Sequence, residues 1–219
     1  MKNALIIAPF LVTHQRNSQY AICKSRIIAY IYLMRKHNGM RPQDVAVLLK
    51  IIAAGNGSWQ NKDLSTALSL SASEISESLN RSQIARLIDG QKKKVFRQSL
   101  MEFLEHGLRY VFPAEPGPLA FGIPTAHAYP FMSNLFPSDE PYVWPDAEGK
   151  VRGVAIEPLY AGVTKAIRSD ENLYKLLALA DVIRVGKVRE RKVAIEELKK
   201  MILHEPSREH HADQSRIKT

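Results

Sequence analysis

The sequence contains one cysteine, Cys23, so an internal disulfide and a cysteine-built zinc site are both excluded. No apolar run reaches the roughly 18 residues that a membrane-spanning helix requires. The phosphate-binding patterns GxxxxGKS/T and GxGxxG are also missing. A chain with a single thiol suits a reducing compartment. We therefore expect a cytoplasmic protein with no metal, no cofactor and no membrane partner.

Acidic residues are missing from residues 1–39, which carry six Lys and Arg residues. The chain has a formal net charge of +9, but from Met40 onward 25 basic residues face 22 acidic ones. Three interpretations of residues 1–39 remain open: an extension outside the native protein that results from a wrongly assigned start codon, a basic arm that binds nucleic acid, or a targeting segment. We favour the first, because Met40-Arg41-Pro42 is a natural beginning for a folded domain.

The run from Asp63 to Arg81 has the spacing of a helix-turn-helix, in which the second helix enters the DNA major groove. It predicts a first helix over 61–68 and a second over 72–80. Their apolar faces are formed by Leu64, Ala67 and Leu68 and by Ile75 and Leu79. Ser71 and Glu74 have the three-residue spacing of a capping box at the start of the second helix.

This stretch resembles the winged helix-turn-helix transcriptional regulators of the MarR type. The matching residues are Leu64, Ser65, Leu68 and Ser69, followed by Ser71, Ser73, Ile75 and Ser76. Ser69 stands where the family usually has glycine, in a turn that often needs a positive φ. The resemblance covers roughly residues 41–123 and implies a DNA-binding regulator with a β-hairpin wing after the motif.

The residues around the motif predict further elements of that domain. Val45, Leu48, Leu49 and Ile52 form one stripe of a helix that begins near Pro42. A helical continuation of the motif is expected through Ile84, Leu87 and Ile88, with its stop at Asp89-Gly90. A further helix is expected over 92–106, with Gly107 as its stop. Beyond it, 108–112 and 119–123 alternate with a period of two around a Pro/Gly turn, which predicts the hairpin of the wing.

The C-terminal half predicts a second, helical module. Residues 124–154 are rich in proline and aromatic side chains, and we expect this connecting segment to be packed down, with a second hairpin formed by 142–144 and 151–154. Helices are expected from Pro158, from Ser169 or Asp170, and from Lys187 to Leu203. The tail, 205–219, is polar and expected to be disordered. The predicted fold is mainly α with a small β-hairpin wing: a winged helix-turn-helix domain at 40–123 plus a C-terminal α-helical module at 155–204.

These features predict a sequence-specific transcriptional regulator that binds double-stranded DNA. Base edges would be read by Ser71, Ser73, Glu74, Ser76, Glu77 and Asn80, and the DNA backbone would be held by Lys92, Lys93, Lys94 and Arg97. A homodimer is expected, with the C-terminal helices as its contact. The alternative is a protein-interaction or antitoxin-like adaptor of the same fold. No nucleophile–base pair is evident, so an enzyme is not expected, and His127 is interpreted as structural.

Overall fold

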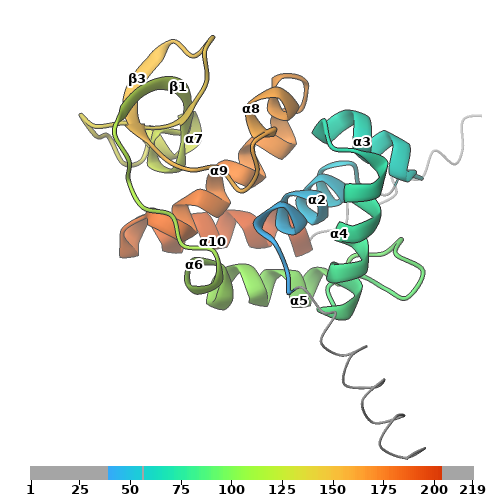
Figure 1. Ribbon diagram of the computed structural model, residues 1–219. Helices are drawn as coiled ribbons and strands as arrows, with labels where there is room; N and C mark the ends of the chain where they lie inside the picture. Colours follow the sequence, from blue (N-terminus) through green and yellow to red (C-terminus); the bar gives the residue numbers. More distant parts are fainter. Residues whose placement is uncertain (1–38, 56, 204–219) are drawn as a thin grey trace, which may run out of the picture. The chain divides into compact units, whose positions relative to one another are not determined.

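The computed structural model describes residues 39–55 and 57–203. The chain divides into two units, residues 1–39 and the part that begins at Met40, and all helices and strands described here belong to the second. It is mostly helical with a small three-stranded sheet, which confirms the coarse fold class (Figure 1). The predicted extension at 1–39 and the predicted disordered tail at 205–219 lie outside the described residues.

Three helices open the described part of the chain: α2 (Pro42–Ala53), α3 (Asn61–Leu68) and α4 (Ala72–Ile84). Pro42 occupies the first turn of α2, where its missing N–H removes no hydrogen bond. The predicted apolar stripe of α2 is buried, as are the inward residues of α3 and α4; these are Val45, Leu48, Leu49, Ile52, Leu64, Leu68, Ile75 and Leu79. The prediction of these three helices is confirmed. The helical continuation predicted through Leu87 and Ile88 is wrong, because α4 ends at Ile84 and Arg86 is left-handed, with φ 58°.

The turn between α3 and α4 has the backbone that the motif needs. Ser69 is left-handed, with φ 52° and ψ 39°, although it carries a side chain where glycine is common. The Ser65 hydroxyl donates to the Leu70 carbonyl at 2.5 Å and helps to close this turn. The capping box is also present, because the Ser71 and Glu74 side chains each accept from the other residue's backbone N–H.

One helical stretch follows, and it differs from the prediction at both ends. It consists of α5 (Arg97–Glu102), a π-helical turn, η1 (Phe103–Gly107), and α6 (Leu108–Val111). The predicted start at Lys92 and stop at Gly107 are both wrong, and 108–112 is not a strand of a hairpin. Leu100, Leu104 and Leu108 are all buried at a spacing of four, so a helical face continues through the stretch that we interpreted as alternating.

The sheet contains β1 (Leu119–Thr125), β2 (Tyr142–Pro145) and β3 (Val151–Ala155). The second half of β1 pairs antiparallel with β2 and its first half with β3, while β2 and β3 pair parallel and close the sheet. The predicted hairpin of β2 with β3 is therefore wrong, although both strands exist. Gly122 permits the closure, because a Cβ there would lie 2.0 Å from the Trp144 carbonyl oxygen.

The segment between β1 and β2 is packed down, as predicted for the proline- and aromatic-rich stretch. It forms two short helices, η2 (Ala126–Ala128) and α7 (Pro130–Ser133). Tyr129 and Trp144 are buried, and their rings lie 4.8 and 5.8 Å from the ring of Tyr174. His127 is nearly buried, packs edge-on against Tyr142 and bonds through Nε2 to the Glu140 carbonyl at 3.0 Å.

The described part of the chain ends with α8 (Val163–Ala166), η3 (Ile167–Ser169), α9 (Glu171–Val185) and α10 (Val188–Leu203). The first of these helices starts later than the predicted Pro158, whereas Asp170 caps α9 as expected by accepting from the Leu173 N–H. Figure 1 shows α9 between the sheet and α2, and it contacts both. α10 packs on α9 and α5. One core therefore runs from Val45 to Ile202.

This shared core removes the basis of the predicted dimer contact. The apolar residues of α9 and α10 that we expected to face a second subunit are covered within the chain; Leu173, Leu176, Leu177, Leu198 and Ile202 are buried, and Ile195 is half-buried against the core. They pack on elements of the same chain, which the pattern of one helix cannot reveal. No helix among residues 39–55 and 57–203 is long and apolar enough to cross a membrane.

Candidate nucleic-acid interface

The outward face of α4 carries the polar residues that the sequence placed there. Ser73, Glu74 and Glu77 are exposed, and Ser76 and Asn80 are half-buried, while Ile75 and Leu79 point into the core. The exposed face is therefore built of hydroxyl, carboxylate and amide groups. These groups can donate to or accept from base edges.

Two of the predicted reading residues are already engaged at the start of the helix. The Ser71 hydroxyl donates to the Glu74 carboxylate at 2.6 Å and lies 3.1 Å from the Ser73 hydroxyl. The hydrogen bonds from the Ser71 side chain and backbone hold the pKa of Glu74 below its ordinary value. Ser71 and Glu74 therefore fix the first turn of α4, and Ser73, Ser76, Glu77 and Asn80 make up the rest of its polar face.

A short two-stranded hairpin follows α4 directly, at residues 87–96, and we call it the basic hairpin. Ile88 and Val95 form an antiparallel bridge, and the Phe96 N–H donates to the Leu87 carbonyl at 2.9 Å. The loop of the hairpin carries Lys92, Lys93 and Lys94. In Figure 1 it is the green loop that connects α4 to α5 and projects outward beside α4.

Asp89 shapes this loop and explains why no helix begins at Lys92. Its Oδ1 accepts from the backbone N–H of Lys93 at 2.6 Å and of Lys94 at 2.9 Å. These bonds hold the pKa of Asp89 below its ordinary value. Lys92 is left-handed, with φ 57°, which interrupts a helix. The three lysines therefore lie in a hairpin and not in the first turn of the following helix.

The four predicted backbone-binding cations have different surroundings. Lys92 donates to the Asn80 side-chain oxygen on α4. Lys93 lies 4.6 Å above the Trp59 ring and donates to the Trp59 carbonyl at 3.1 Å. Lys94 is exposed, and its ammonium group makes no hydrogen bond or ion pair with any residue that the structure describes. No sequence pattern signals the role of Trp59, which only its contact with Lys93 reveals.

Arg97, unlike the lysines, makes a hydrogen bond that stabilises the end of another helix. It is half-buried at the start of α5, and its Nη1 donates to the Ile202 carbonyl in the last turn of α10 at 2.7 Å. A cation that satisfies a C-terminal carbonyl stabilises the helix end. Arg97 is thus close to the lysines in sequence, but in the structure its guanidinium group binds to α10.

A buried ion pair positions α4, and no sequence pattern predicts it. Arg81 donates from Nε and Nη2 to the two carboxylate oxygens of Asp44 at 2.8 and 2.7 Å. Asp44 also accepts from the Arg41 N–H at 2.8 Å. Hydrogen bonding to Asp44 raises the pKa of Arg81. The bidentate pair joins the polar helix α4 to the start of α2.

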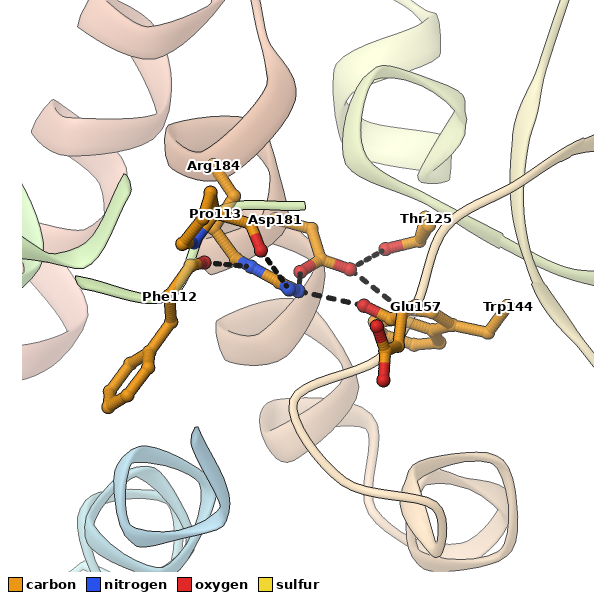
Figure 2. A network of polar contacts seen from close by, with 7 residues as sticks. All are labelled: Phe112, Pro113, Thr125, Trp144, Glu157, Asp181 and Arg184. Carbon is orange, nitrogen blue, oxygen red and sulfur yellow. Dashed lines mark hydrogen bonds and ion pairs between the residues drawn. The ribbon is translucent and has the colours of Figure 1, made fainter. Parts of the chain in front are cut away.

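A second polar network lies deep in the molecule, away from α4 (Figure 2). Asp181 on α9 accepts from Thr125, Trp144 and Arg184 at 3.0, 2.6 and 2.6 Å. Burial raises the pKa of Asp181, and these donors oppose the rise. Arg184 in turn donates to the Phe112 and Glu157 carbonyls at 2.9 and 3.0 Å.

This network is structural, because its members are closed off from solvent. Asp181 is 1% exposed and Arg184 6%. Together they join α9 to β1, to β2 and to the two chain segments that enter and leave the sheet. The burial of Arg184 excludes it from any surface role.

Comparisons of the chain with known protein families, with curated proteins and with solved structures gave no match. The function is therefore inferred from the geometry of α4 and the basic hairpin.

Proposed function

We propose that this protein is a sequence-specific DNA-binding transcriptional regulator of the winged helix-turn-helix kind. α4 is the reading helix, and the basic hairpin takes the place of the wing. The observation that carries the proposal is the contact of Lys92 with Asn80, because it makes the polar face of α4 and the cationic loop one continuous surface. Reading groups beside phosphate-binding cations are what DNA recognition requires.

The residues take different parts in this proposal. The Ser73 and Ser76 hydroxyls and the Glu77 carboxylate are available for base edges, since a carboxylate accepts from cytosine. The Asn80 oxygen accepts from Lys92, and its amide N–H groups are available as donors. Lys94 and its two neighbours neutralise phosphates. Ser71 and Glu74 set the start of the helix, and Arg81 with Asp44 sets its direction.

A protein-interaction or antitoxin-like adaptor is the second candidate, and one observation favours it. Glu74 and Glu77 are both exposed on α4, where their charges repel DNA phosphates. A basic partner surface would suit these carboxylates better. The two candidates differ in how binding responds to salt.

The test is selection of bound fragments from a genomic DNA library by the full-length protein, followed by affinity measurements at several salt concentrations. We expect one enriched sequence and an affinity that falls with salt, with each neutralised phosphate adding about 0.9 to the logarithmic slope. Absence of enrichment at low salt would leave the adaptor as the function.

A dimer remains part of the proposal, because two-fold DNA sites are bound by two-fold proteins. Its contact must use a surface other than the apolar faces of α9 and α10, which are covered within the chain.

A further inference from the structure

α6 and the first half of α10 lie side by side, because the stretch from α5 to α6 runs antiparallel to α10 (Figure 1). Glu105 of η1 pairs with Lys199, in the second half of α10, at 2.8 Å. Directly after α6, the Phe112 carbonyl accepts from Arg184, which lies four residues before α10 begins. The two helices therefore form one surface, which we call the α6–α10 surface.

Cations of both helices lie along the boundary between them. Arg191, Ile195 and Lys199 are four residues apart, so they share one side of α10. Lys199 of this row contacts Glu105, so the row faces η1 and α6. Arg109 follows Glu105 by four residues in the direction of the start of α10, which brings it toward Arg191.

The charge of this surface is positive and is not neutralised within the described part of the chain. Its cations are Arg109, Lys187, Arg189, Arg191 and Lys192. None of the five makes an ion pair or a side-chain hydrogen bond with a residue that the structure describes. Glu190, the acid in the first turn of α10, is nearly buried and accepts from the Lys187 N–H at 2.8 Å. Glu196, one turn beyond Lys192, forms the acidic border of the surface.

Large apolar side chains lie among these cations and face solvent. Tyr110 is 77% exposed and Val188 60%, and Val111 is exposed as well. The Arg109 guanidinium lies 5.7 Å from the centre of the Tyr110 ring. Aromatic and arginine side chains are enriched at the hot spots of protein–protein interfaces. A phosphate backbone offers no apolar group to a valine, so the surface suits a protein better than a nucleic acid.

We propose that the α6–α10 surface binds an acidic segment of a partner protein. Its carboxylates would lie against Arg109, Arg191 and Lys192, since arginine holds a carboxylate with two parallel N–H donors. An apolar side chain between these carboxylates would cover Tyr110 and Val188. Several cations gathered on one surface repel each other, and an acidic partner removes that repulsion.

This docking surface shares no residue with α4 or the basic hairpin. One molecule can therefore bind DNA and the acidic partner at the same time. Docking of the partner does not depend on the proposed function. If that function holds, the partner is held at the DNA site.

The test uses the full-length protein and needs no DNA. Random peptides of about twelve residues, displayed on phage, are selected against the immobilised protein. The affinity of an enriched peptide is then measured by fluorescence anisotropy at about 0.15 M salt, where distant surface charges are screened. We expect enriched peptides to combine several Asp or Glu residues with at least one large apolar residue. Enrichment of basic or uncharged peptides, or of no peptide, would overturn the proposal.

Variants locate the binding site of the enriched peptide. Lys192→Glu should weaken it at least about tenfold, because attraction becomes repulsion. Val188→Ser should weaken it about threefold through the loss of apolar contact. Lys165→Glu, at an exposed lysine on α8, is the matched control and should leave the affinity unchanged. Equal effects of Lys192→Glu and Lys165→Glu would reduce the binding to general charge attraction and contradict the site.

Competition separates this surface from the one proposed for DNA. Duplex DNA should leave the peptide bound, and a variant with Lys92, Lys93 and Lys94 changed to Gln should bind it as tightly as wild type. Displacement by duplex DNA, together with loss of binding in that variant, would place the peptide on the basic hairpin and refute the inference. A single-stranded oligonucleotide that binds more tightly than the peptide, and is lost in Lys192→Glu, would make the surface a nucleic-acid site instead. If the peptide binds as expected but no DNA sequence is selected, the docking surface stands and the proposed function fails independently.

Discussion

The guanidinium of Arg81 and the carboxylate of Asp44 form a bidentate ion pair across 37 residues of sequence, and both side chains are nearly closed to solvent. The pair joins the end of the helix-turn-helix to the first turn of α2. The orientation of α4 therefore depends on a contact outside the motif itself.

Loss of one member of this pair should destabilise the fold strongly. Asp44→Ala leaves the Arg81 charge buried without its partner, so we expect a loss of about 3–5 kcal/mol in the free energy of unfolding. Denaturant unfolding monitored by circular dichroism measures it. The matched control is Glu148→Gln, which removes an exposed partner of Arg168 and should cost less than about 1 kcal/mol. Similar losses in the two variants would contradict the structural role of the pair.

The reading residues and the lysines should affect DNA binding differently. Changing Ser73 and Ser76 together to Ala should preserve folding, because Ala has the better helix propensity. Affinity for the selected site should fall by about 1–3 kcal/mol per lost base contact, with non-specific binding unchanged. Quantitative gel-shift or fluorescence anisotropy measurements on specific and scrambled DNA separate these effects.

Changing Lys92, Lys93 and Lys94 to Gln should weaken binding to all DNA sequences alike and flatten the salt slope by up to about 0.9 per lost contact. Salt titrations of the triple variant against wild type give this slope. If the serine pair has no effect and the lysines alter only protein–protein association, the adaptor function applies.

The basic hairpin should loosen in acid. The backbone hydrogen bonds of Lys93 and Lys94 lower the pKa of Asp89 in the folded state. A depressed carboxyl pKa contributes stability that is present above the unfolded value of about 3.9 and is lost as the pH falls through the folded value. The amide protons of Lys93 and Lys94 should therefore move together in an NMR titration between about pH 5 and pH 2, and constant shifts over this range would refute the role of Asp89.

A chain that begins at Met40 should be as stable as the full-length protein. The apolar stripe of α2 is covered by α4 and α9, which both lie in the unit that starts at Met40. Thermal unfolding midpoints of the two forms should agree within a few degrees. A larger loss on truncation would show that residues 1–39 contribute to the stability of this unit.

Removal of α9 and α10 should unfold the protein and not merely change its oligomeric state. The sequence pattern predicts that these helices hold two subunits together, whereas in the structure they fill the core under α2, α5 and α6. A chain that ends at Gly153 should lose its cooperative thermal transition. A folded monomer after this truncation, beside a dimer of the full chain in light scattering, would restore the original interpretation.

The local signals of the sequence determined the helices of the motif and their turn. Three kinds of signal involve only residues a few positions apart: the apolar spacing of α2, α3 and α4, the Ser71–Glu74 capping box, and the Asp170 cap of α9. They can therefore be recognised without knowledge of the fold. The polar outer face of α4 follows from the same period. These parts of the candidate interface were predictable because each depends on neighbouring residues only.

Tertiary structure decided the elements for which a short hydrophobic pattern fits both a strand and a helix. Leu108 to Phe112 fits both an alternating strand and a helical face, and burial of Leu108 in line with Leu104 selects the helix. β2 and β3 pair in parallel because each of them also pairs antiparallel with β1. The residues between β2 and β3 do not reveal this arrangement. The place of Lys93 over Trp59 and the pair of Arg81 with Asp44 join residues 34 and 37 positions apart. Contacts at that separation arise from packing of the whole core. The surface that we propose for DNA therefore depends on local sequence at α4 and on long-range packing at the basic hairpin.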